Sequence, residues 1–313
     1  MGMVPEMRDE RSGIKDRAAS RVYSPPMNHR TLVSALVLLL LGAPTALAAQ
    51  PAATQPAAAS LTDAQMEQFL LTGKVGRARE LDKGVTASTR ATLTDGTLTH
   101  DAHIQSIDQS KQEFKGGPVP EFDFRDKWQF NVAAYKIDRL LGLDLVPVTV
   151  ERRWRTEAAS FSWWVDDGLM DEGERQNKKL TPPNQACWND QMLLIRLFDQ
   201  LIDNIDRNAG NIVITRTWRL WAIDHTRAFR RSKTPPKLET LTRIDRRLLE
   251  RLTMLDFATL KRELKAYIVD GDVRALLARR DAIVAHFRAR GEAALYDRPD
   301  AAAGCVAAAA LLN

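Results

Sequence analysis

Apolar side chains in the first part of the chain follow a strand-like alternation. Residues 64–71 carry a helical pattern behind the capping segment Leu61-Thr62-Asp63, and the segments that follow alternate between apolar and polar positions. The pair Asp95-Gly96 marks a tight turn of the kind that joins antiparallel strands. These signals predict a small antiparallel meander, with strands expected at residues 74–79, 87–93 and 100–107.

Helical periodicity dominates further along the chain. Residues 125–141 place apolar side chains at steps of three and four and close at Gly142, which is typical of an amphipathic helix with a glycine stop. Residues 189–202 and several stretches between 238 and 295 repeat the pattern. Further strands are expected at residues 145–150, 160–165, 212–215 and 218–223. The order predicts an α+β fold with two lobes, a β-rich lobe at 63–168 and a mostly helical lobe at 169–297.

The amino-terminal region has the pattern of an export signal. Residues 32–41 are a ten-residue apolar run that follows His29 and Arg30 and precedes small residues at 46–48. A ten-residue helix is about 15 Å long, half of the roughly 30 Å bilayer core. We therefore expect a cleaved signal peptide at 27–48, no stable membrane span after cleavage, and a periplasmic or secreted protein. Residues 1–26 lie upstream of the expected start, 49–62 read as a flexible linker, and 298–313 as an Ala-rich tail.

Composition and charge exclude several classes of protein. Apolar residues at 44% and charged residues at 27% are ordinary globular values, unlike those of disordered, collagen-like or multi-span membrane chains. The net charge of +5 falls to +3 once residues 1–48 are removed, and no basic run with interleaved aromatics stands out. Nucleic acid is therefore not an expected partner.

Cysteine usage gives little structural information. Cys187 and Cys305 are the two cysteines of the chain, which is too few for a disulfide scaffold. One bridge is permissible in an oxidising compartment. The sequence favours two unpaired thiols.

The stretch 201–229 carries the candidate chemistry. A helix delivers Asp206 and Asn211 into a loop, and a hairpin then delivers Asp224. Phosphoryl transfer needs a carboxylate to orient the attacking hydroxyl and oxygen ligands for divalent metals that neutralise the phosphates. Two carboxylates and an amide in this order meet that need.

At these residues the chain resembles the atypical kinases of the protein-kinase-like fold. D-R-N-A-G-N at 206–211 is similar to the catalytic loop of the phosphatidylinositol 3- and 4-kinase-like, HipA-type and secreted Golgi casein kinase families. I-D-H-T-R-A-F at 223–229 is similar to the segment that ordinary kinases write as D-F-G. The resemblance implies Asp206 as catalytic base, Asn211 and Asp224 as ligands of Mg²⁺ or Mn²⁺, and ATP or another nucleotide as donor.

The resemblance extends over about 230 residues, from Phe69 to Tyr296. Residues 83–86, K-G-V-T, look like the phosphate-covering turn, which implies nucleotide contacts from Lys83, Gly84 and Thr86. A Lys-Gly pair between strands is also an ordinary turn. Residues 131–143 match the regulatory helix of the group.

Two positions depart from the pattern. Members of the group hold the phosphates with a Lys on the third strand and hold that Lys with a Glu on the helix. Here Gln105 and Asn131 stand at those places. Two amides can hydrogen-bond to each other, but they bring no positive charge to a nucleotide.

Several readings of the function stay open. In the first, Lys83 reaches the phosphates as a flexible point charge, and the protein is a secreted atypical kinase or a related phosphoryl or nucleotidyl transferase. In the second, it is a pseudokinase that binds nucleotide or acts as a scaffold without transfer. In the third, the donor is not ATP in the usual pose, because ATP is scarce outside the cytoplasm. The acceptor is open among protein, glycan and small molecule, and an unrelated α+β envelope protein remains an alternative.

Three further groups flank the expected cleft. Trp163 and Trp164 lie near the expected hinge, where an aromatic ring either stacks on a base or packs between the lobes. The acidic stretch 166–174 reads as a solvated loop. A basic group after Asp224 either recognises an anion or pairs with these acids; its members are Arg227, Arg230 and Arg231.

Overall fold

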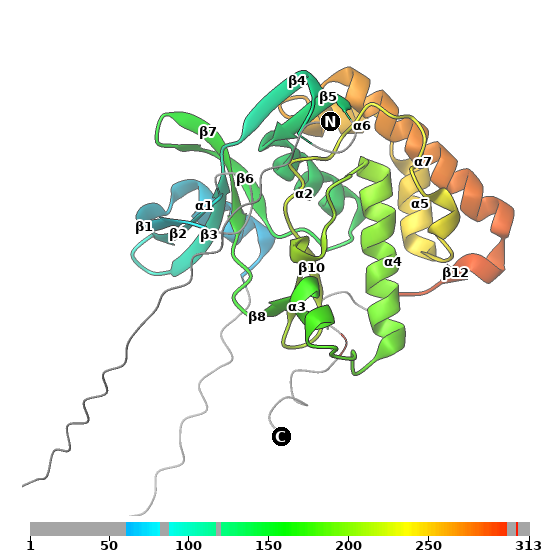
Figure 1. Ribbon diagram of the computed structural model, residues 1–313, viewed down its shortest axis with the longest axis horizontal. Coiled ribbons are helices and arrows are strands. Elements are labelled where there is room, and N and C mark those ends of the chain that lie inside the picture. Colours follow the sequence, from blue (N-terminus) through cyan, green and yellow to red (C-terminus); the bar gives the residue numbers. More distant parts are fainter. Residues whose placement is uncertain (1–60, 82–87, 117–119, 299–304, 306–313) are drawn as a thin grey trace, which may run out of the picture. The chain divides into compact units, whose positions relative to one another are not determined.

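Strands and helices are segregated along the chain in the computed structural model, which describes residues 61–81, 88–116, 120–298 and 305 (Figure 1). All of these residues belong to one compact unit, Ala58–Asn313. The expected signal peptide, most of the expected linker, and the phosphate-covering turn with Lys83, Gly84 and Thr86 lie outside the described residues.

An antiparallel five-stranded sheet forms the first part of the unit. Its strand order is β1-β2-β3-β7-β6. The predicted meander is confirmed in β1 to β3, and β6 and β7 add to its far edge. The strands are β1 (Lys74–Glu80), β2 (Ser88–Thr94), β3 (Thr99–Gln105), β6 (Thr149–Trp154) and β7 (Glu157–Trp163).

Two helices pack against the β6–β7 edge of this sheet. Helix α1 (Asp63–Thr72) begins at Thr62, whose side chain forms a capping box with Gln65. Helix α2 (Gln129–Leu141) ends at Gly142, which has a φ of 58°. Glycine accepts this left-handed conformation without the Cβ penalty that other residues pay.

A hairpin between β3 and α2 corrects the sequence prediction. Residues 125–127, expected in the helix, belong to β5 (Glu121–Lys127), which pairs with β4 (Asp108–Phe114). Arg125 fixes β5 to the helical part of the molecule, because its guanidinium donates two 3.0 Å bonds to the buried Asp272 and one to the Phe229 carbonyl.

The second part of the unit is mostly helical. A small sheet of order β10-β9-β8 stands beside α4, while α5, α6 and α7 pack together (Figure 1). The elements are β8 (Gly168–Asp171), α3 (Glu172–Asn177), α4 (Gln185–Ile202), η1 (Ala209–Asn211), β9 (Ile212–Thr215), β10 (Leu220–Ala222), η2 (Leu238–Thr240), β11 (Ile244–Asp245), α5 (Arg246–Met254), α6 (Phe257–Leu264), α7 (Asp270–Arg290), η3 (Glu292–Ala294) and β12 (Leu295–Tyr296).

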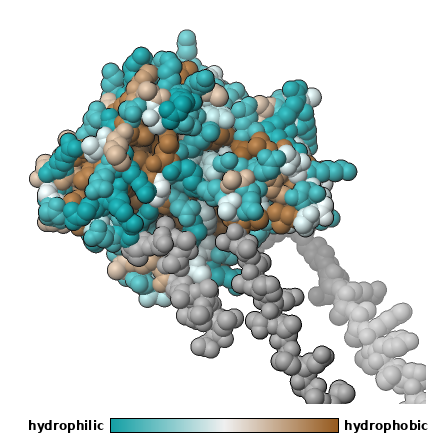
Figure 2. Space-filling model, turned by 180° about the vertical axis from the view of Figure 1, so that it is seen from behind, coloured by the Kyte–Doolittle hydropathy of each residue, from teal (hydrophilic) through white to brown (hydrophobic). Residues whose placement is uncertain are grey.

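One hydrophobic core runs through both parts. Phe130 of α2 lies against Phe229 of the segment after β10, with ring centroids 5.4 Å apart. On the face seen in Figure 2, hydrophilic residues surround several separate hydrophobic areas. None of the helices within the described ranges is long and apolar enough to cross a membrane.

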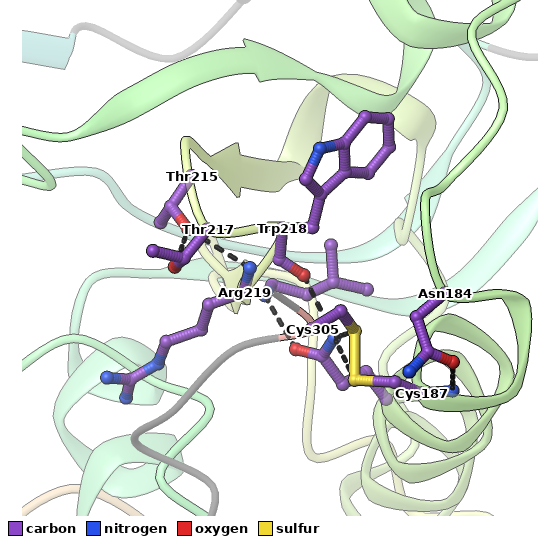
Figure 3. Close-up of a disulfide and its surroundings, with 9 residues drawn as sticks. Asn184, Cys187, Thr215, Thr217, Trp218, Arg219 and Cys305 are labelled. Carbon is purple, nitrogen blue, oxygen red and sulfur yellow. Dashed lines mark hydrogen bonds between the residues drawn. A yellow bond between two sulfur atoms is a disulfide. The ribbon is translucent and has the colours of Figure 1, made fainter. Parts of the chain in front are cut away.

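A disulfide bond joins Cys187 to Cys305, so the expectation of two free thiols is wrong (Figure 3). Their Cα atoms lie 5.5 Å apart although 118 positions separate them in sequence. The fold brings the first turn of α4 beside the end of the chain, where the Cys305 amide donates to the Thr217 carbonyl. Gln191 of α4 bonds to the same turn through the Trp218 carbonyl.

Candidate active site

The loop after α4 holds Asp206 and Asn211 in a fixed relation. The Asn211 side-chain amide donates to the Asp206 carbonyl at 3.2 Å, and within the described residues no hydrogen bond uses its Oδ1 atom. Asn208 supports the turn between them, because its Oδ1 accepts from the Gly210 amide. The Asp206 side chain is exposed at the end of this loop. Asn211 therefore has a carbonyl oxygen left for a cation beside the expected base.

The hairpin that follows brings Asp224 to the same place. Strands β9 and β10 pair so that Ile212 faces Ala222, and the Ile223 amide donates to the Asn211 carbonyl at 3.1 Å. Asp224 then adopts a φ of 53°, a sparsely populated conformation for a residue with a Cβ. The Thr226 hydroxyl donates to its carboxylate at 3.0 Å.

Arg207 holds the two segments together, and the sequence analysis missed it. Its guanidinium bonds to both carboxylate oxygens of Asp199 in α4, at 3.0 and 3.1 Å. It also donates to the carbonyls of Asn211, at 2.8 Å, and Ile223, at 2.6 Å. One side chain thus fixes the helix, the loop and the end of β10. The sequence feature that could have revealed this role is the arginine directly after Asp206, because a guanidinium offers several hydrogen-bond donors in one rigid plane.

Electrostatics distinguish the acids of the site. Partial burial raises the pKa of Asp206, and the negative charge of Asp224 raises it further. Burial and the charge of Asp224 also raise the pKa of Asp126, a residue of β5 that the sequence analysis did not single out. These two acids are therefore close enough to Asp224 to feel its charge. Within the described residues no three His, Cys, Asp or Glu side chains form a group that would hold a metal ion by themselves.

The two substituted positions form a neutral hydrogen-bonded pair. The Asn131 amide donates to the Gln105 side-chain carbonyl at 2.7 Å and to the Ser160 hydroxyl at 3.1 Å, while its own oxygen accepts from the His225 amide at 2.7 Å. Gln105 is 1% exposed and Asn131 is 4% exposed. The structure thus places these amides in contact, and Asn131 links β3, β7 and the segment that bears Asp224.

A cavity of about 510 Å³ lies between the sheet and the helical part. Gln105, Asn131, Gly210 and Asp224 are among the residues that line it, whereas Asp206 and Asn211 are not. Burial lowers the pKa of the lining residue His103, and the nearby Asp224 partly opposes this shift. The rest of the lining is mixed: Arg90, Asp166 and Glu174 are charged, whereas apolar side chains come from Val146, Val165, Leu169, Met170, Val213 and Ile223.

Both candidate hinge tryptophans line the cavity, but one ring face of each is covered. His100 stacks on Trp163 with centroids 3.7 Å apart, and the guanidinium of Arg90 lies 4.0 Å above Trp164. Trp163 also packs edge-on against Phe69 of α1, with centroids 5.6 Å apart. These ring contacts all come from the β-rich part, from α1, β2 and β3, so the observed packing of the two tryptophans lies within that part rather than between the lobes.

The basic group after Asp224 pairs with acids of β5 and α7. The acidic stretch 166–174 is not the expected solvated loop, because most of it forms β8 and the first turn of α3. Arg227 bonds to Glu121 at 2.5 Å, and Arg231 lies within 4 Å of Asp123 and Asp272. Arg227 also lies over the Phe124 ring at 4.0 Å.

The donor set suits a hard divalent cation. Asn211 Oδ1 and the Asp224 carboxylate are oxygen ligands, which Mg²⁺ and Mn²⁺ prefer over nitrogen or sulfur. Mg²⁺ is usually bound by one or two carboxylates together with waters and substrate phosphates. The residues present therefore fit such an ion.

Comparisons with solved structures agree with this architecture. The chain is similar to a hydra Fam20 protein solved with sugar, with a TM-score of 0.55 and 15% identity over 75% of this chain and 92% of that one. It is similar to a Golgi casein kinase solved with Mn and ADP bound, with a TM-score of 0.53 and 16% identity over 76% of this chain and 80% of that one. A scan of protein-family models and a search of curated proteins find no match.

These likenesses establish the fold. The chain has the atypical-kinase-like architecture that the sequence predicted, α+β with a β-rich first part and a helical second part. At this level of identity the likeness concerns the fold alone.

Proposed function

We propose that the protein is an exported, metal-dependent atypical kinase or a related phosphoryl or nucleotidyl transferase. The observation that carries the proposal is the Arg207 clamp, which holds the Asp206–Asn211 loop against the strand end that delivers Asp224. Phosphoryl transfer depends on such positioning more than on covalent chemistry by the protein. The kinase-like fold and the Mn and ADP named for one structural neighbour are consistent with this reading.

Each residue of the loop has a distinct role in this proposal. Asp206, exposed on the loop between α4 and η1, orients the acceptor hydroxyl and accepts its proton. Asn211 and Asp224 hold Mg²⁺ or Mn²⁺, which neutralises phosphate charge when bound. Because the pKa of Asp206 is raised, the acid limb of the pH–rate profile lies above that of an ordinary aspartate, and activity rises as the carboxyl ionises.

ATP or another nucleotide occupies the cavity in this proposal. The apolar residues of the lining suit a base, and Asp224, which also lines the cavity, suits a cation that accompanies the phosphates. Gln105 offers an amide donor from β3. Lys83, Gly84 and Thr86 are proposed to cover the phosphates from the turn between β1 and β2.

Export is supported by two independent features. The first is the signal-like sequence at 27–48, and the second is the Cys187–Cys305 disulfide. Disulfides persist in the periplasm and outside the cell and are rare in reducing cytosol. The cavity is proposed to hold the nucleotide donor and gives no information on the acceptor. The acceptor is therefore left open among protein, glycan and small molecule.

A nucleotide-binding pseudokinase is the second candidate, and the Gln105–Asn131 pair favours it. Both amides are buried and hydrogen-bonded to each other, so neither brings a positive charge to the phosphates. Under this alternative the cavity binds a nucleotide, and the protein acts as a binding or scaffolding module without transferring a phosphoryl group.

Thermal unfolding with nucleotide and metal tests the proposal. Mn²⁺ with ATP is expected to raise the Tm of the wild-type protein, because a ligand that binds the folded state stabilises it. Asp224→Ala should abolish this increase, and Asp281→Ala, which alters an exposed acid of α7, should keep it. If wild type and Asp224→Ala respond alike, the metal site is refuted. Phosphoryl transfer to an acceptor distinguishes the kinase from the pseudokinase. A kinase should lose this transfer in Asp206→Asn while the variant keeps the Tm increase.

A further inference from the structure

His100 lies behind the nucleotide cavity and contacts two residues that line it. It stands on β3, three positions from His103, so the two side chains point to opposite faces of the sheet. His103 lines the cavity, whereas His100 stacks on Trp163 at 3.7 Å and reaches Asp166 of the segment between β7 and β8. Trp163 and Asp166 both line the cavity, so His100 acts on it only through them.

Both ring nitrogens of His100 face acceptors that cannot donate. Nδ1 lies 2.7 Å from the Asp101 carbonyl, and Nε2 lies 2.5 Å from a carboxylate oxygen of Asp166. A neutral imidazole has one N–H group, so it makes one of these bonds, whereas the imidazolium has two and makes both. Only the imidazolium can satisfy both contacts at once.

We propose that His100, Trp163 and Asp166 form a pH-sensitive clasp that fixes the segment joining the two parts and strengthens nucleotide binding when His100 is protonated. This inference rests on the proposed function, since it describes regulation of the same cavity. His100 is a positioning residue, which touches no nucleotide and holds Asp166 at the cavity wall.

The described charged groups around the ring favour the clasp. Asp166 approaches from the segment after β7 and Asp101 from β3 itself. Arg90 of β2 forms an ion pair with the Asp101 carboxylate at 2.5 Å. Its charge is therefore engaged by Asp101 rather than by Asp166. Helix α1 contributes the uncharged Phe69 against Trp163. Loss of the proton leaves the Asp101 carbonyl or the Asp166 carboxylate without its donor, and the exposed Asp166 side chain is the one free to turn into solvent.

The expected effect is modest because Asp166 is 64% exposed at its side chain. Ion pairs of this kind are worth little, and they change a binding constant about two- to fivefold. We expect Mn²⁺–ADP to bind about two- to fivefold more tightly at pH 5.5 than at pH 8.0 through this contact. A Debye length of about 10 Å at 0.1 M salt implies that added salt shrinks the difference.

Tryptophan emission of the ligand-free full chain tests the clasp without any nucleotide. A protonated imidazole quenches an indole on which it stacks, so Trp163 emission should rise between pH 5.5 and pH 8.0. His100→Phe keeps a stacked ring but has no donor, and it should remove this pH-dependent step. His100→Gln is the second variant in case the first unfolds, and His286→Gln is the matched control on α7. An identical step in wild type and both His100 variants overturns the clasp.

Calorimetric titration with Mn²⁺–ADP tests its effect on binding. The phosphates of ADP and the carboxyls of the cavity titrate in every variant. The measured quantity is therefore the change in the Kd of Mn²⁺–ADP between pH 5.5 and pH 8.0 in the wild type, compared with the same change in His100→Phe. A difference of about two- to fivefold supports the proposal, and no difference overturns it. If no protein binds Mn²⁺–ADP at either pH, the proposed function and its regulation both fall, while the emission step still reports whether the clasp exists.

Discussion

The buried amide pair yields the sharpest prediction. If Gln105 and Asn131 stand where related folds hold a Lys–Glu ion pair, the double variant Gln105→Lys/Asn131→Glu should restore that pair. Each single change should be strongly destabilising. Gln105→Lys places an ammonium at a position that is 1% exposed, with the Ser88 hydroxyl at 3.4 Å and an amide as its neighbours. Asn131→Glu removes the donor to Gln105 and Ser160 and buries a carboxylate.

The magnitude follows from burial. A buried charge without its partner costs about 3–5 kcal/mol, so the two single changes sum to about 6–10 kcal/mol. In the double variant the two charges neutralise each other, and the Glu keeps an acceptor for the His225 amide. We expect a coupling energy of about 2–3 kcal/mol between the two positions, near the upper end for residues in contact.

Urea unfolding of the four proteins measures this coupling. The slope with denaturant should stay constant across the set, so that differences in midpoint report stability. A control cycle that combines Gln105→Lys with Asp281→Asn, on the surface of α7, should be additive. If the main cycle is also additive within about 0.5 kcal/mol, the two positions do not act as a pair, and the assignment of Gln105 to the phosphate-facing place is wrong.

Three other contacts give predictions of defined size. Arg207→Lys should lower stability by about 2–4 kcal/mol and weaken Mn²⁺–ATP binding, since one ammonium cannot hold a carboxylate and two carbonyls at once; an unchanged Tm with unchanged binding would contradict the clamp. Replacing Cys187 and Cys305 by Ser should cost up to about 5 kcal/mol in urea unfolding, from the 118-position loop they close, and a loss below about 1 kcal/mol would show that the bridge constrains little. Asp272→Asn, which removes the buried carboxylate charge that faces Arg125, should cost about 3–5 kcal/mol in thermal scans, whereas Arg246→Gln at an exposed pair should cost less than about 1 kcal/mol.

Local signals in the sequence located most elements of the fold. The Thr62 cap, the Asp95-Gly96 turn and Gly142 each mark an element boundary that the structure confirms. The β4–β5 hairpin was missed because its strands carry mostly polar residues. Strands as exposed as β4 lack the apolar alternation that identifies strands in a core.

The candidate site was harder to foresee where it depends on contacts between distant segments. The order of Asp206, Asn211 and Asp224 is visible in the sequence, and so is the loss of the Lys–Glu pair. The Arg207 clamp and the Cys187–Cys305 bridge depend on which segments the fold brings together, and sequence separation says nothing about that distance. The roles of the site residues remain predictions until metal and nucleotide binding are measured.

The disulfide also closes much of the helical part of the protein into a covalent ring. The ring from Cys187 to Cys305 contains Asp206, Asn211 and Asp224. A protease that pulls on either end of the chain can unravel residues only up to the bridge. If the chain is exported through a narrow channel, as proposed, passage has to precede oxidation, because the closed ring resists threading until a reductant opens it.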